Sequence, residues 1–183
     1  ALPGNAGMAD DATCVNIGAK DIPAIVEFAV ANKIDYAVVA PDDPLVLGCV
    51  DALEEKGIKA QGAAGFSLGE LAAVTFAGMI SREDGFRLVC ARAGHMNRAA
   101  EGAESVMAAV LKLDNETVEN LCCKYEQVYP VNYNCPGQLV VSGSASEMEQ
   151  LKADVKGAKG RYLQLPVSGG FHSPFMKEAA SGF

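Results

Sequence analysis

The sequence predicts an α/β protein in which a ferredoxin-like βαββαβ unit is inserted into a larger parallel-sheet body. Over the first third of the chain, short Val-rich runs alternate with segments of helical periodicity. Residues 65–69 then read G-F-S-L-G between an apolar run and an Ala- and Leu-rich segment. From residue 105 onward, the pattern follows the order strand, helix, strand, strand, helix, strand. The 183 residues suffice for one large domain or two small ones.

The first segment predicts a parallel βαβ unit. Residues 21–32 carry apolar side chains at helical spacing, and Asp21 is a suitable N-cap. The P-D-D-P turn at residues 41–44 starts a second helix, which is expected to end at Lys56 because a glycine follows. A helix between two strands makes their pairing parallel. The expected strands are 34–40 and 58–64.

The remaining elements follow from caps, turns and periodicity. A helix is expected after the glycine motif to about Gly78, and a capping box of Ser81 and Asp84 opens another helix to about Ala100. A last helix starts at Pro174. Within the βαββαβ unit, the expected strands are 106–113, 128–132, 138–142 and 161–167, and the expected helices are 114–125 and 144–155, the latter capped by Ser144 and Glu147.

Composition and charge exclude several classes of function. The formal net charge is −8, so the chain lacks the basic face with which a general nucleic-acid binder neutralises phosphates. No apolar run approaches the roughly 20 residues that span a bilayer, and the first residues show no basic and then apolar signal pattern. We therefore expect no nucleic-acid partner, no membrane partner and no signal peptide.

The cysteines indicate a reducing compartment and no metal site. Six cysteines are present without any C-x-x-C pair, and only two histidines accompany them. Free, buried thiols in a reducing cytosol are the favoured interpretation. We therefore expect a cytoplasmic protein that holds no metal.

The glycine motif at residues 65–69 predicts a nucleophile elbow. Glycines on both sides of Ser67 allow a sharp strand-to-helix turn from which the hydroxyl projects, and the N–H of Leu68 is then available to an oxyanion. A serine needs a base within hydrogen-bond reach. His95 lies inside a predicted helix, whereas His172 lies in a glycine-rich loop of the kind that presents catalytic groups, so His172 is the favoured base.

Residues 63–180 resemble malonyl-CoA:acyl-carrier-protein transacylases in several ordered motifs. The resemblance implies a parallel-sheet acyltransferase/hydrolase-like core at 61–104 and 166–183, with the ferredoxin-like subdomain at 105–165. The motifs are G-F-S-L-G-E at 65–70, where the family usually reads G-H-S-L-G-E, the arginine-bearing helix at 87–96, M-A-A-V at 107–110, V-N-Y-N-C-P-G-Q at 131–138 and L-P-V-S-G-G-F-H-S-P at 165–174.

The resemblance implies a ping-pong transfer of a malonyl group in fatty acid biosynthesis. Ser67, activated by His172, would attack malonyl-CoA, and the malonyl-serine ester would pass to the phosphopantetheine thiol of acyl carrier protein. Arg92 would pair with the malonyl carboxylate, Leu68 would donate its N–H to the oxyanion, and Asn134 would contact substrate. The implied partners are malonyl-CoA and acyl carrier protein, and no bound cofactor is expected because the coenzyme A thioester is a substrate.

The chain departs from that family at both ends of the match. We find no counterpart of the family's first strand and its P-G-Q-G-S-type loop, and the family continues well beyond Phe183. The match is therefore expected to be truncated, which leaves the activity open. Phe66 replaces the more usual histidine and leaves nucleophile and base in place.

Residues 1–60 resemble instead the N-terminal domain of glycinamide ribonucleotide synthetase. The resemblance rests on P-G-N-A-G-M-A at 3–9 and on I-D-Y-A-V-V-A-P-D-D-P-L-V-L-G at 34–48, a loop that helps hold the ribonucleotide in that family. The changeover near residues 57–60 suggests a chimera, natural or engineered. Three functions therefore stay open: an acyltransferase, a catalytically inactive chimera, and a ribonucleotide-binding fragment related to purine biosynthesis.

Overall fold

The computed structural model describes residues 1–40 and 42–183. Pro41, the first residue of the predicted P-D-D-P turn, lies outside the described residues. The chain divides into two compact units, Ala1–Ala64 and Gly65–Phe183, and each is described by itself.

Three short helices form the ordered part of the first unit: α1 (Ile22–Ala31), α2 (Asp42–Val46) and α3 (Cys49–Glu55). Helix α1 begins as predicted at Asp21, whose carboxylate accepts a hydrogen bond of 3.2 Å from the backbone N–H of Ala24. The single helix expected from the turn to Lys56 is instead broken at Gly48, which adopts a φ of +79° that interrupts helical geometry. Helices α1 and α3 then bury a small apolar cluster.

The two strands predicted in this unit are absent from the described residues. Residues 34–40 and 58–64 run as irregular chain, and Tyr36 and Val38 are 79% and 90% exposed. An apolar run becomes a buried strand only when a neighbouring strand takes up its backbone hydrogen bonds. Neither run has such a neighbour within residues 1–40 and 42–64, so the predicted parallel βαβ unit is wrong here.

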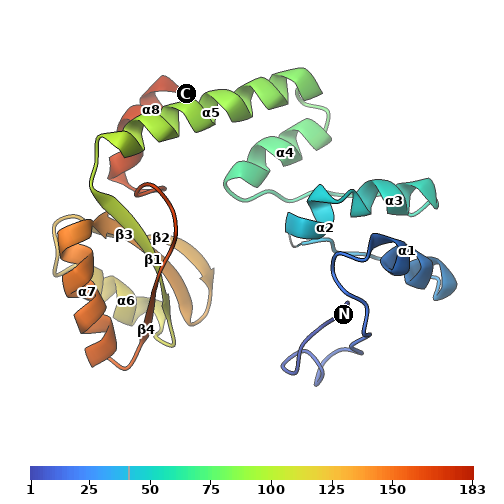
Figure 1. Ribbon diagram of the computed structural model, residues 1–183, viewed down its shortest axis with the longest axis horizontal. Helices are drawn as coiled ribbons and strands as arrows, with labels where there is room; N and C mark the ends of the chain where they lie inside the picture. The colour runs from blue at the N-terminus through green and yellow to red at the C-terminus, as the bar shows by residue number, and fades with distance from the viewer. Residues whose placement is uncertain (41) are drawn as a thin grey trace. The chain divides into compact units, whose positions relative to one another are not determined.

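Helices of the second unit hold the glycine motif and the end of the chain. They are α4 (Leu68–Phe76), α5 (Arg82–Glu101), a 3₁₀ turn η1 (Pro174–Met176) and α8 (Lys177–Gly182). Ser81 caps α5 as expected, accepting a 3.0 Å hydrogen bond from the N–H of Asp84, but the Asp84 carboxylate accepts from the Ser81 hydroxyl (2.8 Å) and so does not complete the predicted capping box. Helix α8 lies along α5 (Figure 1), and the two bury Ala99, Ala100, Met176 and Ala179.

A four-stranded antiparallel sheet forms the rest of the second unit. The elements follow the predicted order: β1 (Ser105–Leu111), α6 (Asn115–Cys122), β2 (Val128–Cys135), β3 (Gln138–Ser144), α7 (Ala145–Gly157) and β4 (Arg161–Gln164). The spatial order is β2-β3-β1-β4, and every neighbouring pair is antiparallel. In the described part of the chain this is the only sheet, so the parallel sheet expected for the larger body is not formed there.

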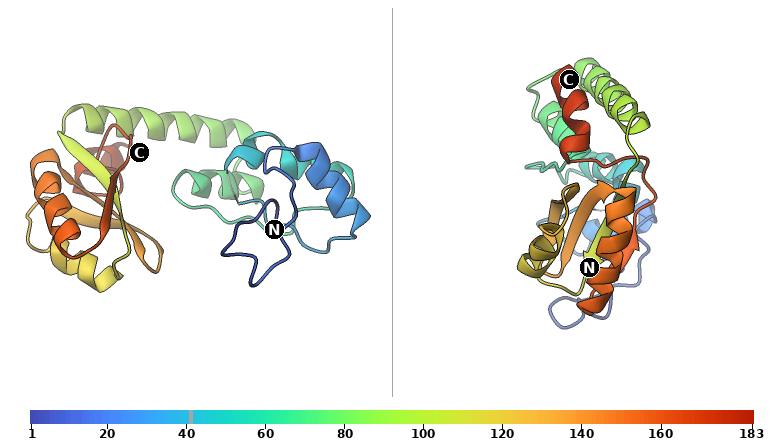
Figure 2. Two further views of the ribbon diagram at one scale, coloured as in Figure 1. Left: turned by 60° about the horizontal axis from the view of Figure 1, so that its bottom comes forward. Right: turned by 90° about the vertical axis from the view of Figure 1, so that its left-hand side faces the viewer.

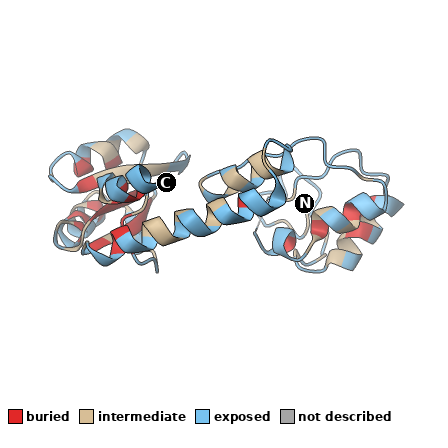
Figure 3. Ribbon diagram, turned by 90° about the horizontal axis from the view of Figure 1, so that it is seen from above, coloured by how far each residue is buried: buried red, intermediate tan, exposed pale blue. Residues whose placement is uncertain are grey.

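The sheet buries residues on both of its faces. Helices α6 and α7 cover one face (Figures 1 and 2), where Val110, Val118, Leu139, Val141 and Leu151 are fully buried. Strands β1 and β3 are buried over most of their length, whereas β2 and β4 are mostly intermediate or exposed (Figure 3). On the other face, a smaller cluster of β1 and β3 residues packs against partly buried side chains of the segment that follows β4. That segment leads directly to the loop of His172.

One predicted cap differs from its expected form. Ser144 stands at the N-cap of α7, but its side chain makes no capping hydrogen bond. The Glu147 carboxylate instead accepts hydrogen bonds from the backbone N–H groups of Glu126 (3.4 Å) and Gln127 (2.7 Å). The predicted capping box is therefore wrong, because the loop before β2 competes for the glutamate.

Asp114 gives a pH-dependent stability prediction. Its carboxylate accepts hydrogen bonds from Thr117 N (2.7 Å) and Thr117 Oγ1 (2.9 Å), and these bonds hold the Asp114 pKa below its usual range. The stabilisation is therefore complete above the unfolded-state pKa of about 3.9 and is lost as the pH falls through the lower folded-state pKa. Asp114→Ala should lower the Tm at neutral pH, and the gap to wild type should narrow in acid.

Thermal unfolding followed by circular dichroism across the acidic range measures this gap. Asp114→Asn is the matched control, because it keeps a side-chain acceptor without an ionisable group. A wild-type to alanine gap of equal size at every pH would contradict the prediction.

Candidate active site

The elbow around Ser67 has the strained backbone that the glycine motif predicts. Ser67 adopts φ +56° and ψ −111°, an unfavourable conformation for a residue with a side chain, and α4 begins at the next residue. A Cβ added at Gly65 would collide with the backbone of Gly69, so glycine is required at that position for the chain to turn this tightly. The turn therefore presents the Ser67 hydroxyl at the N-terminus of α4.

Three predicted site residues meet at the Ser67 hydroxyl. Nε2 of His172 lies 2.9 Å from Oγ of Ser67, across 105 positions of sequence. Nη2 of Arg92, on α5, donates a hydrogen bond of 3.0 Å to the same oxygen. When His172 carries its proton on Nδ1, Nε2 accepts the hydroxyl proton while the guanidinium contacts an oxygen lone pair. The arrangement can remove a proton from the hydroxyl and stabilise negative charge on its oxygen.

Buried contacts position the loop of His172. The N–H of Gly170 donates a 2.8 Å hydrogen bond to the buried Oγ of Ser105, at the start of β1, and the Ser173 hydroxyl donates to the Gly170 carbonyl. A Cβ at Gly170 would come within 2.7 Å of Ser142 Oγ, so only glycine fits there. The Phe171 ring packs with both the helical cluster and the second face of the sheet. The loop is thereby held between α5 and the sheet.

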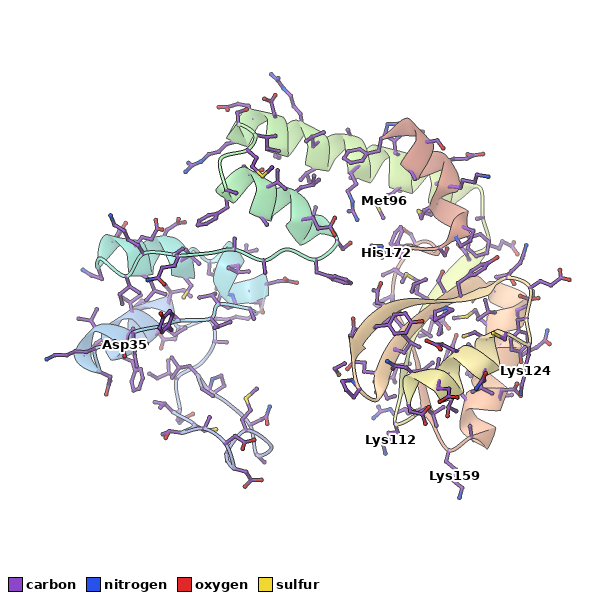
Figure 4. The ribbon with its side chains drawn as sticks, turned by 180° about the vertical axis from the view of Figure 1, so that it is seen from behind. Asp35, Met96, Lys112, Lys124, Lys159 and His172 are labelled. Carbon is purple, nitrogen blue, oxygen red and sulfur yellow. The ribbon has the colours of Figure 1, made fainter. Side chains whose placement is uncertain are left out.

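A cavity of about 380 Å³ opens beside this group. Met96 and His172 lie close together at its wall (Figure 4), and the wall carries two cations, Arg92 and Lys177, with no carboxylate among its lining residues. Fixed positive charge favours an anionic ligand. The lining residues are Arg92, Met96, His172, Ser173, Met176, Lys177, Ala179, Ala180 and Phe183.

Not every residue predicted for the site lies at this group. Leu68 is the first residue of α4, so its backbone N–H lies next to Ser67. Asn134 is exposed near the end of β2, and no hydrogen bond joins it to Ser67, Arg92 or His172 in the described residues. The other histidine, His95, lies on α5 with Nδ1 3.0 Å from Nη2 of Arg98. The functional roles of these residues remain predictions.

Two residues at the site carried no sequence signal. Lys177 stands five residues after His172 and reaches the cavity only because α8 folds back on α5. Ser105 reaches the histidine loop only because β1 starts beside it. Nothing in the local sequence pattern around Lys177 or Ser105 marks either residue as part of a site.

Other chemical features of the described residues are limited. Across residues 1–40 and 42–183, no group of three or more His, Cys, Asp or Glu side chains is placed to hold a metal ion. No helix in these ranges is long and apolar enough to cross a membrane. All six cysteines are free, but only Cys49 and Cys122 are buried, so the expectation of buried thiols is wrong for the other four. Burial raises the pKa of the Cys122 thiol to about 12, which leaves it a poor nucleophile.

The chain is similar in sequence and in structure to malonyl CoA-acyl carrier protein transacylases. The malonyl CoA-acyl carrier protein transacylase of Bacillus subtilis is 39% identical over 140 residues, which cover 73% of this chain and 44% of that protein. A crystal structure of malonyl CoA-acyl carrier protein transacylase from Clostridium perfringens superimposes with a TM-score of 0.67 and 31% identity, covering 89% of this chain and 55% of that one. A malonyl-transacylase in complex with a type II polyketide synthase acyl-carrier protein gives a TM-score of 0.65 with 30% identity, covering 89% and 59%.

Two family models match different but overlapping parts of the chain. Residues 1–66 match the phosphoribosylglycinamide synthetase N domain, and residues 45–183 match the acyl transferase domain. The two matches overlap around the predicted changeover at residues 57–60. The chain spans less than half the length of the curated relatives that it matches. The structural neighbours give the chain an α/β acyltransferase fold. Because the acyl transferase model covers more than half of the sequence, the chain belongs to the acyl transferase domain family.

Proposed function

We propose that this chain transfers a malonyl group from malonyl-CoA to the phosphopantetheine thiol of acyl carrier protein through a malonyl-Ser67 ester. The observation that carries the proposal is the 2.9 Å contact between Ser67 Oγ and His172 Nε2 at a strained elbow. The names of the relatives, malonyl CoA-acyl carrier protein transacylases, support the choice of acyl group and acceptor.

The first step forms the acyl-enzyme. His172 Nε2 takes the proton as Ser67 Oγ attacks the thioester carbonyl, and the carbonyl oxygen becomes an oxyanion. The N–H of Leu68 is the proposed donor to that oxyanion, because the first N–H groups of a helix have no intrahelical partner. When the carbon–sulfur bond breaks, the proton on His172 passes to the leaving sulfur of coenzyme A.

The second step returns the enzyme to its free form. The phosphopantetheine thiol gives its proton to His172 and attacks the ester, and Ser67 Oγ leaves and takes the proton back. Coenzyme A and acyl carrier protein are thus substrates, and this sequence of steps uses no bound cofactor. A relative of known structure is described as a complex with its acyl-carrier protein, which supports this class of acceptor.

Arg92 is proposed to select the malonyl carboxylate. Its guanidinium carries five N–H donors, so the hydrogen bond to Ser67 Oγ leaves others free for a carboxylate at the cavity. Asn134 is kept as a proposed substrate contact on the family resemblance alone.

The order of the elements supports a division of the second unit into a core and an inserted subdomain. We propose that residues 105–165 form a ferredoxin-like subdomain inserted into the acyltransferase core at 61–104 and 166–183. The βαββαβ order and the antiparallel arrangement β2-β3-β1-β4 favour this interpretation. A cytoplasmic location stays a prediction.

A second candidate function belongs to residues 1–60, which we propose derive from a phosphoribosylglycinamide synthetase N domain. The match of that family model to residues 1–66 favours a fusion of two unrelated pieces. Binding of glycinamide ribonucleotide without acylation of Ser67 would favour a ribonucleotide-binding fragment. A folded chain that does neither would favour an inactive chimera.

Incubation with malonyl-CoA should add one malonyl group to the protein. Because only an activated serine forms this ester, the mass adduct should be absent in Ser67→Ala and should form at least about 100-fold more slowly in His172→Ala. Intact mass spectrometry measures both the adduct and its rate.

Ser181→Ala is the matched control, because Ser181 is exposed on α8 and its hydroxyl donates only to the Lys177 carbonyl. A malonyl adduct that persists in the Ser67→Ala variant would show that Ser67 is not the nucleophile.

Substitution of Arg92 should change the acyl preference. Loss of a charge-assisted pair with the malonyl carboxylate costs about 1.5–3 kcal/mol, so Arg92→Gln should slow malonylation by roughly 10–100-fold relative to acetylation from acetyl-CoA. The acetyl rate corrects for the lost hydrogen bond to Ser67. Arg92→Lys should fall between, since an ammonium cannot pair in bidentate fashion. An unchanged ratio of malonyl to acetyl rates would remove Arg92 from carboxylate recognition.

A further inference from the structure

Phe66 stands one residue before the nucleophile and touches the base. Its ring centroid lies 6.2 Å from that of the His172 imidazole, and the two planes meet at 26°. This is an offset-stacked geometry, within the 4.5–7 Å range in which aromatic pairs attract one another. The contact therefore joins the elbow to the histidine loop through a second link beside the Ser67 hydrogen bond.

The Phe66 side chain contributes little to the packing of the second unit. Its side chain is 67% exposed and belongs to none of the buried clusters of the second unit. Exposed aromatic residues are common and need no special reason by themselves. This ring is different because the partner that it contacts is the imidazole.

A hydrogen bond at Nε2 alone leaves the imidazole free to rotate about that contact. The His172 ring is hydrogen-bonded to Ser67 and stacks on Phe66, and Met96 lines the same cavity wall. The loop backbone holds His172 at a φ of +61°, so the ring is placed by a strained segment. A flat ring against one face restricts the imidazole plane.

We propose that Phe66 is a positioning residue for the general base, holding the imidazole plane so that Nε2 stays on the Ser67 hydroxyl. The proposal rests on the proposed function in that His172 is the base. It accounts for an apolar aromatic residue in the exposed position between Gly65 and Ser67. Any flat ring at residue 66 should serve, whereas a branched aliphatic side chain of similar bulk should not.

The direct test of the contact is proton NMR of the two histidines. Removal of the ring in Phe66→Leu removes its ring-current effect, so the ring protons of His172 should shift, while those of His95 should stay in place. The chain has only these two histidines, which makes the assignment simple. This readout needs neither malonyl-CoA nor acyl carrier protein, so it is independent of the proposed transfer reaction. Unshifted His172 signals would overturn the proposal.

The kinetic test measures how fast Ser67 reacts. Malonylation by malonyl-CoA and labelling by a fluorophosphonate, a serine-directed reagent, are followed side by side by intact mass. Phe66→Leu should slow both by about tenfold with the malonyl-CoA KM nearly unchanged, because misplacement of a base lowers the reactive fraction and leaves substrate contacts intact. Phe66→Tyr should restore the rate. Phe86→Leu is the matched control, since Phe86 is 70% exposed on α5.

The two reagents separate the possible failures. Fluorophosphonate labelling that slows in Phe66→Leu, on a protein that never takes a malonyl group, would support the positioning role and overturn the proposed acyl transfer. Equal labelling rates in wild type, Phe66→Leu and Phe66→Tyr would overturn the positioning role. A leucine variant that loses rate together with its thermal unfolding transition, and a tyrosine variant that restores neither, would assign Phe66 to folding and also overturn it.

Discussion

The site depends on a single hydrogen bond between Ser67 and His172, which joins two loops 105 residues apart. Neither loop is relaxed. Ser67 and His172 both adopt positive φ, and glycines at residues 65 and 170 leave room for neighbouring atoms that a Cβ would displace. Backbone strain of this kind persists only when the surroundings fix it, so the rest of the second unit can be understood as what fixes it.

Two packed surfaces meet at the histidine loop. Helices α5 and α8 enclose one cluster and the second face of the sheet carries another, and Phe171 packs with both. The Ser105 hydroxyl then ties Gly170 to the first strand. At the other end of the hydrogen bond, α5 brings Arg92 to the Ser67 hydroxyl oxygen. The sheet, α5 and the elbow therefore all position groups around this oxygen, and a shift in any of them would change the distance between Ser67 Oγ and His172 Nε2.

Local patterns in the sequence predicted the parts of this arrangement that depend on local chemistry. The elbow followed from two glycines beside a serine, the α5 N-cap followed from Ser81, and the βαββαβ order followed from periodicity. The choice of His172 over His95 rested on loop context, and the structure places His172 at the serine. Each of these signals lies within a few residues of the feature that it predicts.

Several errors concern features that depend on distant partners. The Val-rich run at 34–40 has the composition of a buried strand, but a strand requires a neighbour that the run itself does not specify. Glu147 was expected to cap its own helix and instead binds the N–H groups of the loop before β2. Lys177 and Ser105 enter the site through tertiary packing alone. Residue propensity and spacing report on a single segment, whereas a strand pairing, the Glu147 contact and the positions of Lys177 and Ser105 each depend on how two segments pack together.

The most direct measurement of the central interaction is a rapid-mixing assay of coenzyme A release. With malonyl-CoA alone, an activated Ser67 should release a burst of coenzyme A equal to one equivalent per chain and then stop, and release should resume when acyl carrier protein is added. Slow linear release with no burst, unchanged by the carrier protein, would contradict a covalent malonyl-Ser67 intermediate and the activation of Ser67 by His172.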